Sequence, residues 1–187
     1  MDEKEATQAL LKLLQGAYSG ELAAALAYGG HHLSVRDYPE EKKEIFKIMG
    51  DEIHHRERLL LMIRELGGEV DERLEQRMKT IGTAISSFCR AGRYLPFGWF
   101  FSMYGAGKLE SKNVKEYEDA ARLAWFAGYQ HFILELLKFA EVEWEHERYF
   151  KEKAKLHFLY SLVPHWKSPS SKEHIKSSFF EYISEKL

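Results

Sequence analysis

The sequence predicts an all-α protein built as a helical bundle. Apolar residues recur at helical spacing over almost the whole chain, alternating strand patterns are nearly absent, and Gly and Pro separate a few long periodic segments. The 187 residues match the length of one domain that can bury a sizeable core. We therefore expect a single domain over residues 1–187, made of four long helices, a connecting helix and a short C-terminal helix.

A clear turn signal separates the first two predicted helices. Residues 6–32 carry apolar side chains three or four positions apart, until the segment Asp37–Pro39 interrupts the pattern. Proline is favoured at the first position of a helix, so the second helix is expected over about 40–66. The pair Gly67–Gly68 then ends that helix, as C-terminal glycines commonly do.

The next segment, about 70–96, is predicted to connect two helix pairs. One helical stripe of apolar residues runs through it, which indicates an amphipathic helix over about 70–91. An aromatic stretch follows up to Tyr104, and aromatic residues at such spacing most often belong to a core. Together, residues 70–106 also have the character of a membrane-contacting surface, a dimer surface or the wall of an apolar channel. The stripe consists of Val70, Leu74, Met78, Ile81, Ile85 and Phe88.

The second pair of long helices is expected over about 98–127 and 130–158, with a turn near Gly128. The tail, about 159–187, begins with a loop. Within it, Ser170–Glu173 fits a capping box that opens a short last helix. That helix would dock on the body through Ile175, Phe179 and Ile183.

Composition excludes several classes of protein. Twenty-seven Lys and Arg against 29 Asp and Glu give a net charge of −2, which argues against a broad nucleic-acid-binding surface. The single cysteine, Cys89, cannot form an internal disulfide, and the first residues lack the character of a secretory signal. No apolar run is long enough for a transmembrane helix. We therefore expect a cytoplasmic protein, with peripheral contact to the inner face of a membrane as an open alternative.

Three glutamates stand on otherwise apolar helix faces: Glu21, Glu52 and Glu143. An uncompensated charge on such a face is energetically costly, so a partner is expected for each. Two of the three open the same short pattern, Glu-x-x-His, in which the histidines are His55 and His146. Side chains at positions i and i+3 lie on one helix face and can bind a common metal ion.

The spacing around the two Glu-x-x-His patterns repeats in the two halves of the chain, which makes them stronger evidence for a metal site than either pattern alone. In the first half of the chain, Glu21 is followed by Tyr28 and then by Glu52. In the second half, Glu110 is followed by Tyr117 at the same interval, and then by Glu143 at an interval only two positions longer. The halves therefore superpose with an offset of about 90 residues, as a repeated helix pair.

Distances along the helices place the four glutamates near one level of the bundle. Asp37 precedes Glu52, and Gly128 precedes Glu143, by the same number of positions. At the rise of an α-helix, both glutamates lie about 22 Å from these turn residues. The partner glutamates on the preceding helices lie about 24 Å and about 27 Å from the same turn residues. One glutamate from each of two helices, with Glu-x-x-His from the other two, is the donor set of a two-metal carboxylate site.

Carboxylate and imidazole donors favour iron or manganese over metals selected by thiolates. Four carboxylates would neutralise two divalent ions, whereas the same carboxylates without metal would repel one another. Metal binding should therefore stabilise the fold as well as support chemistry. We expect two iron ions, with manganese or a mixed iron–manganese pair as alternatives.

With this pattern, the chain resembles the ferritin-like di-iron carboxylate superfamily over about residues 6–158, and within it most resembles the demethoxyubiquinone hydroxylase group. The resemblance implies a ferritin-like four-helix bundle. It also implies that Glu21 and Glu110 are the single-helix ligands and that Glu52 and Glu143 bridge the metals. The terminal nitrogen ligands it implies are His55 and His146. Proteins of this kind use two ferrous ions to bind and reduce dioxygen.

Several other polar residues have more than one possible role. Glu118 is an alternative to Glu110 as the ligand on the third long helix. It lies closer to Gly128, however, which displaces it by about 7 Å along the bundle relative to Glu143. We therefore favour Glu110. Tyr28 and Tyr117 are either partners of the ligands or ordinary core tyrosines.

Other charged and histidine residues are expected to have no role in the site. His31, His32 and His131 fall near helix ends and are expected to cap them or to be exposed. Of the alternating glutamates from 141 to 147, only Glu143 and Glu147 fit the apolar stripe, so the others should face solvent.

The leading functional expectation is a di-iron oxidoreductase, a monooxygenase in character, that activates dioxygen. It would hydroxylate or oxidise an apolar, quinone-like small molecule and would need an electron donor. The alternatives are a ferroxidase or peroxide-scavenging protein of ferritin or rubrerythrin type, and a metal-stabilised bundle without enzymatic activity. No nucleic-acid partner is expected, and a homodimer is an open alternative.

Overall fold

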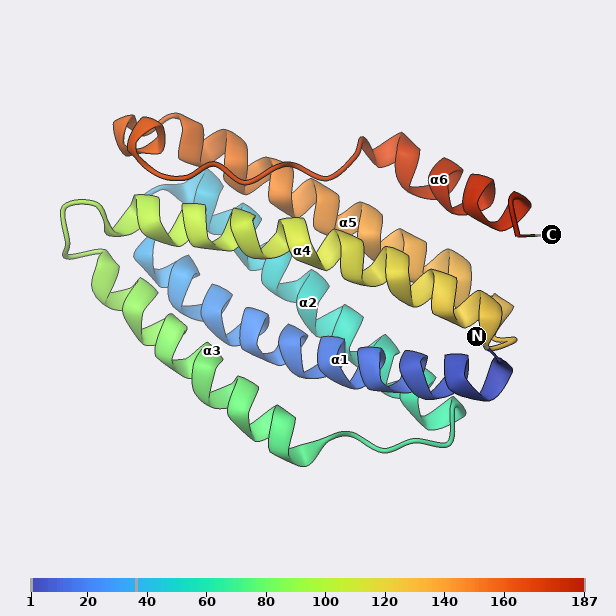
Figure 1. The fold of residues 1–187 in the computed structure, drawn as a ribbon. Coiled ribbons are helices and arrows are strands. Elements are labelled where there is room, and N and C mark those ends of the chain that lie inside the picture. Colours follow the sequence, from blue (N-terminus) through green and yellow to red (C-terminus); the bar gives the residue numbers. More distant parts are fainter. Residues whose placement is uncertain (1, 36, 187) are drawn as a thin grey trace. The chain divides into compact units, whose positions relative to one another are not determined.

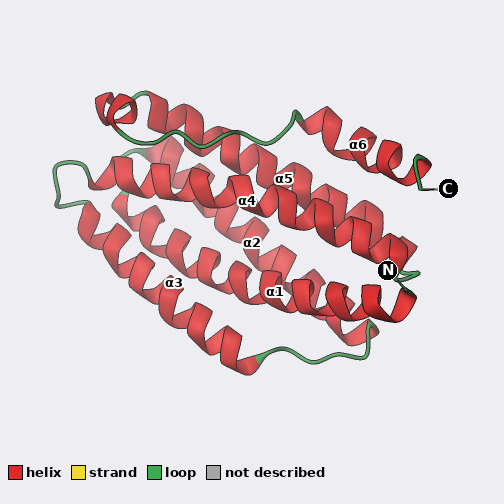
Figure 2. Cartoon of the chain, in the orientation of Figure 1, coloured by secondary structure: helices red, strands yellow, loops and turns green. Residues whose placement is uncertain are grey.

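The computed structural model describes residues 2–35 and 37–186, and every regular element within these ranges is a helix (Figure 2). The all-α prediction is thereby confirmed. None of these helices has the length and apolar character needed to cross a membrane. In chain order (Figure 1), the elements are α1 (Glu3–Ser34), α2 (Pro39–Glu65), α3 (Glu72–Gly92), α4 (Gly98–Phe126), α5 (Gln130–Lys155), the 3₁₀ helix η1 (Phe158–Leu162) and α6 (Lys172–Ser184).

The predicted turns are where the helices end. Pro39 is the first residue of α2, as expected for a residue without a backbone N–H to satisfy. Gly67 and Gly128, each two positions after the last residue of α2 or α4, have positive φ angles of 70° and 78°. Glycine adopts this left-handed conformation without steric cost, which explains why the chain turns at these residues.

Two details near the C-terminus differ from the prediction. Helix α5 ends at Lys155 rather than at 158, because the chain changes to the 3₁₀ helix η1 at Phe158. Helix α6 has Ser171 at its N-cap, and this side chain makes no capping hydrogen bond. The expected capping box from Ser170 is therefore wrong. The pKa of Glu173 is lowered, first by a hydrogen bond from its own backbone and then by one from the Ser171 side chain.

The described residues divide into two compact units. The N-unit comprises residues 14–102 and contains most of α1, all of α2 and α3, and the start of α4. The C-unit comprises residues 2–13 and 103–186 and contains the start of α1, the rest of α4, and α5, η1 and α6. The single ferritin-like domain expected over residues 1–187 stays a prediction, and its two end residues lie outside the described ranges.

In the N-unit, α3 approaches α1 at two glycines (Figure 1). A Cβ atom on Gly30 would lie 2.1 Å from the backbone oxygen of Ser86, and one on Gly82 would lie 2.6 Å from the Cα atom of Ala23. The absence of side chains therefore lets the two backbones come together. The amide of Gln15 also donates to the backbone oxygen of Glu69, at 2.6 Å, which ties the segment before α3 to α1.

The apolar stripe of α3 and the aromatic stretch after it are largely exposed. Ile81, Ile85 and Phe88 retain 37%, 40% and 51% of their accessible surface. The expectation that the aromatic stretch belongs to a core is correct for Phe100. It is wrong for the three residues Tyr94, Phe97 and Phe101, which are exposed. Helix α3 approaches α1 through its small residues, which leaves Ile81, Ile85 and Phe88 exposed to solvent.

In the C-unit, the tail returns beside α5 and ends in α6, which contacts α5 (Figure 1). Ile175, Phe179 and Ile183 are buried, with 0%, 3% and 6% of their surface exposed. These three side chains stand three or four positions apart and so form one face of the helix. The predicted docking of the last helix is confirmed.

His31 is buried rather than exposed or capping, which corrects the expectation for this residue. Helix α1 continues to Ser34, so His31 is a full residue of its last turn and stacks against Tyr28 at a ring distance of 6.4 Å. Desolvation by burial lowers the pKa of His31 from 6.5 to about 3. His32 is half-buried and His131 is exposed.

This burial predicts a loss of stability in acid. The unfolded chain protonates His31 near pH 6.5, whereas the folded chain does so only near pH 3. The contribution of His31 to folding is therefore complete above pH 6.5 and is lost as the pH falls towards 3. Urea denaturation at a series of pH values should show a smaller slope over this range for His31→Leu than for the wild type. His131→Leu, at an exposed position, should leave the slope unchanged, and equal slopes for all three proteins would contradict the prediction.

Candidate metal centre

The N-unit brings together three of the predicted ligands. Glu21 lies on α1, and Glu52 and His55 lie one turn apart on α2. Each offers a ligand atom, and these atoms lie within 4.8 Å of one another. The side chains are almost fully buried, with 4%, 0% and 2% of their surfaces exposed. The Nδ1 atom of His55 lies 3.7 Å from Oε1 of Glu21. We refer to these three residues as the N-trio.

The C-unit brings together the three corresponding residues of the second half. Glu110 lies on α4, and Glu143 and His146 lie one turn apart on α5. Their ligand atoms also lie within 4.8 Å of one another, and 0%, 0% and 2% of their surfaces are exposed. The Nδ1 atom of His146 lies 3.8 Å from Oε2 of Glu143. These residues form the C-trio.

Asn113 is a polar neighbour of the C-trio that the sequence reasoning did not identify. Its side-chain amide donates to Oε2 of Glu110 at 2.8 Å and, more weakly, to Oε2 of Glu143 at 3.4 Å. It stands three residues after Glu110, on the same face of α4. A search for polar residues one turn from each proposed ligand would have found it. This bridge orients both carboxylates, as hydrogen bonds behind metal ligands commonly do.

The donor atoms of each trio fit a first-row divalent metal. Each trio combines two carboxylates with one imidazole, the oxygen and nitrogen donors that suit iron and manganese. Two buried carboxylates carry the negative charge that one divalent cation neutralises. Placing two carboxylates so close together inside a protein is unfavourable unless a cation or protons compensate the charge. A bound metal ion would therefore remove the main electrostatic cost of each trio.

The structure separates the two candidates for the ligand on α4. Glu110 lies in the C-trio, with none of its surface exposed, whereas Glu118 is half-buried and is not part of the trio. Desolvation raises the pKa of Glu118, and Arg122 lowers it in part. Glu118 lies two turns further along the helix, towards Gly128, as its spacing indicates.

We predict that Glu110→Ala loses bound metal and that Glu118→Ala keeps it. Removing Glu110 takes one of three donors from the C-trio, while Glu118 contributes none. Elemental analysis of both purified variants after loading with ferrous iron without oxygen would measure the difference. A full metal content in Glu110→Ala, or a loss in Glu118→Ala, would show that the ligand on α4 is misassigned.

The two tyrosines of the repeat are buried in their units. Tyr28 stacks with His31, and Tyr117 packs its edge against Phe139 at a ring distance of 5.3 Å. Their exposed fractions are 3% and 1%. Both occupy equivalent positions in the two halves, two helical turns after a proposed ligand, and their role beside the trios stays a prediction.

One of the alternating glutamates on α5 differs from expectation. The apolar stripe predicts that Glu141 faces solvent, but it is buried because Lys176 of α6 donates to its carboxylate at 2.8 Å. Glu145 is exposed and pairs with Lys172. Glu147 is buried, as its place on the apolar stripe indicates. The docking of the C-terminal helix, rather than the metal trio, therefore explains the burial of Glu141.

Comparisons of the chain with protein-family models, with curated proteins and with solved structures found no match. Within each unit, the structure brings together the three ligands that the sequence predicts for it.

Proposed function

We propose that this protein is a di-iron oxidoreductase with a ferritin-like four-helix bundle. In this proposal the two trios serve one oxygen-activating centre, and the reaction hydroxylates or oxidises an apolar, quinone-like organic substrate. One observation carries the proposal: each half of the chain buries two carboxylates and one imidazole whose ligand atoms lie within 4.8 Å of one another. A structural role alone gives no reason for the same costly arrangement to occur twice.

The spacing of the sequence supports joining the two trios in one centre. Glu52 follows Asp37, and Glu143 follows Gly128, by the same number of positions, and each of these turn residues lies two positions before the helix of its glutamate. The single-helix ligands stand at similar distances before those turns. Two halves related in this way place equal donor sets at equal depths, which is the arrangement of a two-metal site in a four-helix bundle.

The chain itself would supply binding, orientation and exclusion of water. Two iron ions, when bound, would supply the redox chemistry that reduces dioxygen. The glutamates and histidines of the trios would hold the ions, and Asn113 would fix the direction of two carboxylates. Leu59 and Leu136 stand one and two helical turns from His55 and Glu143 on the same helix faces, and both are fully buried. Such neighbours would exclude water from the site.

The exposed face of α3 supports an apolar substrate drawn from a membrane. We propose that residues 70–106 contact the surface of an anionic bilayer from the cytoplasmic side, with Ile81, Ile85 and Phe88 entering it. Amphipathic helices with basic residues bind such surfaces through both apolar burial and charge. The basic residues of α3 and the turn after it are Arg73, Arg77, Lys79, Arg90 and Arg93.

Vesicle binding tests this contact directly. The protein should co-sediment with vesicles that contain phosphatidylglycerol. Phe88→Asp should weaken this binding at least tenfold, because a carboxylate is unfavourable in the apolar layer and is repelled by the negative surface. Leu134→Asp is the matched control, since it alters an exposed leucine on α5. Equal vesicle binding by Phe88→Asp, or a dimer that Phe88→Asp dissociates in the absence of lipid, would contradict the proposed membrane contact.

The proposed activity can be tested with protein loaded anaerobically with ferrous iron. About two irons per chain are expected, together with oxygen consumption that an apolar quinol and a reductant sustain over many turnovers. Oxygen consumption that stops once the added iron is oxidised would favour a ferroxidase. Bound metal that is inert to oxygen would indicate a structural bundle. Failure to bind iron would overturn the proposal.

A further inference from the structure

The residue directly after the N-trio histidine is held by a network from two other helices. Arg56 follows His55 on α2, and its guanidinium forms an ion pair with Glu75 of α3. It also donates to the backbone oxygen of Tyr18 at 3.1 Å and to the Tyr18 hydroxyl at 2.6 Å. The guanidinium carbon lies 3.8 Å from the centre of the Tyr18 ring. Arg56 therefore links α2 to α1 and α3.

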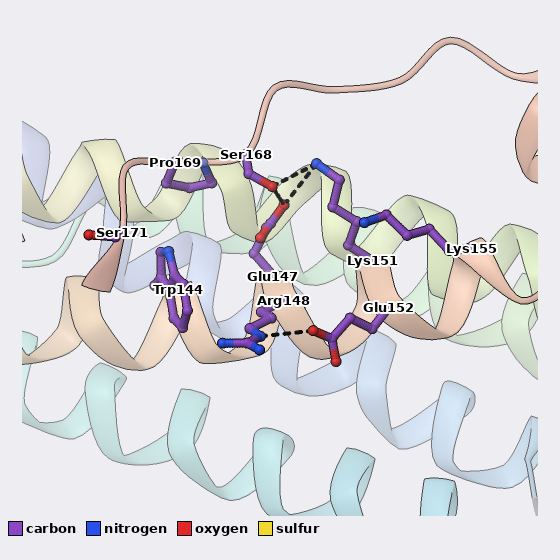
Figure 3. Close-up of a pocket in the computed structure, with 9 residues that line it drawn as sticks. All are labelled: Trp144, Glu147, Arg148, Lys151, Glu152, Lys155, Ser168, Pro169 and Ser171. Atoms are coloured by element: carbon purple, nitrogen blue, oxygen red, sulfur yellow. Dashed lines mark hydrogen bonds and ion pairs between the residues drawn. The ribbon is translucent and has the colours of Figure 1, made fainter. Parts of the chain in front are cut away.

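The residue directly after the C-trio histidine is held in the same manner by the tail. Glu147 follows His146 on α5, and its Oε1 atom accepts from Nε1 of Trp166 at 2.7 Å and from the Ser168 hydroxyl at 2.7 Å. Lys151, one turn further along α5, donates to the Ser168 hydroxyl at 2.6 Å and lies 3.6 Å from Glu147 (Figure 3). The tail is thereby fastened to α5 beside the proposed ligand.

Trp166 also contacts the helix that carries the single glutamate of the C-trio. A Cβ atom on Gly107 of α4 would lie 2.7 Å from the Trp166 ring, so only glycine leaves room for the indole. The ring of Tyr104, one turn earlier on α4, packs edge-on against Trp166 at 5.3 Å, and its hydroxyl bonds the backbone oxygen of Pro164. Trp166 therefore spans α4 and α5 within one turn of Glu110.

The two networks occupy equivalent positions in the repeat. Arg56 and Glu147 each follow a ligand histidine, and their contacts with Glu75 and Trp166 both span 19 positions of the chain. Each network also contacts the helix that carries the single glutamate of its trio, α1 or α4. In both cases the contacted residue lies three positions before that glutamate. Those contact residues are Tyr18 before Glu21 and Gly107 before Glu110. The repeat thus extends to the segment that follows each Glu-x-x-His helix, although the side chains and their charges differ.

We infer that the two networks are equivalent clamps, each of which sets the spacing of the two helices that carry one trio. Arg56, Glu75, Glu147 and Trp166 are accordingly positioning residues for metal binding. The inference rests on the proposed function, since it assigns these residues a role towards the metal ions of that centre. A clamp one turn from its ligands keeps two carboxylates and an imidazole at metal-binding distance when their charges would separate them.

Cobalt(II) titration followed by visible absorption tests the inference without relying on activity. Trp166→Ala should weaken one of the two Co²⁺ sites at least tenfold, and Glu75→Ala should weaken the other. To assign the sites, each change is combined with Glu110→Ala, which leaves the N-trio intact, or with Glu21→Ala, which leaves the C-trio intact. Glu75→Ala should reduce the Co²⁺ affinity of the remaining site only when it is combined with Glu110→Ala. Trp166→Ala should do so only when it is combined with Glu21→Ala.

Controls separate positioning from a general loss of stability. Phe179→Ala removes a buried side chain from α6 in the C-unit without touching a clamp, so it should lower the melting temperature and leave both Co²⁺ affinities and the cobalt spectrum unchanged. Trp166→Phe retains most of the ring packing but loses the N–H donor, and it should give an intermediate Co²⁺ affinity.

Two results would overturn different parts of the account. Wild-type Co²⁺ affinity and spectrum in both clamp variants, while the wild type binds two ions, would reject the clamps and leave the proposed function standing. Failure of the wild type to bind Co²⁺ would reject the proposed function itself, and the clamps with it.

Discussion

Glu143→Ala is expected to lose metal and at the same time to stabilise the metal-free protein. Glu143 is fully buried, and its carboxylate lies with that of Glu110 in the C-trio. Without metal, removing one carboxylate relieves repulsion and the cost of burying its charge, so the apo variant should melt several degrees above the apo wild type. Ferrous iron should raise the melting temperature of the wild type and have little effect on the variant.

Glu145→Ala is the matched control for this experiment, because Glu145 lies two residues away on α5 but is exposed and pairs with Lys172 at the surface. It should retain the metal content of the wild type and its stabilisation by iron. Thermal melting with and without ferrous iron measures both effects. If the apo form of Glu143→Ala is less stable than the apo wild type, and iron stabilises both equally, Glu143 is a structural residue and not a ligand.

Gly30→Ala is expected to destabilise the N-unit strongly, although alanine is normally the better residue in a helix. The added Cβ atom would lie 2.1 Å from the backbone oxygen of Ser86 on α3, and backbone cannot move aside as a flexible side chain can. Helix α3 must therefore shift away from α1. Overpacking of this kind costs about 1–3 kcal/mol or more in the free energy of unfolding. Urea denaturation measures this loss.

Gly20 provides the control within the same helix. A Cβ atom there meets nothing within 4 Å, so Gly20→Ala should stabilise the protein by about 0.5–1 kcal/mol through helix propensity alone. The two substitutions are chemically identical, but they should change the free energy of unfolding in opposite directions. A Gly30→Ala variant as stable as Gly20→Ala would mean that α3 does not approach α1 in this way.

The local features of the fold could be predicted because they depend on neighbouring residues in the chain. Pro39, Gly67 and Gly128 determine where helices begin and end through backbone geometry, and the sequence contains that information directly. The pairing of glutamate with histidine in each trio is a local feature of the same kind. The i, i+3 spacing brings Glu52 beside His55 on α2 and Glu143 beside His146 on α5.

The features that could not be predicted depend on contacts between segments distant in the sequence. His31 is near a helix end, where residues are often exposed, but packing within the N-unit buries it. Glu141 falls off the apolar stripe, but α6 covers it and supplies Lys176. Gly107 weakens the helical pattern of α4 in the sequence, whereas in the structure it accommodates Trp166 from a loop. In each case, tertiary packing outweighs a local preference.

The magnetic properties of the iron-loaded protein after exposure to oxygen test the proposal that the two trios serve one centre. Electron paramagnetic resonance spectroscopy at low temperature, with the iron content of the same sample, distinguishes the two cases. If the proposal is correct, the fully oxidised protein gives almost no signal, because the spins of two neighbouring ferric ions cancel, and partial reduction produces a mixed-valence signal. An intense signal of isolated high-spin ferric ions, accounting for all the iron present, would contradict it.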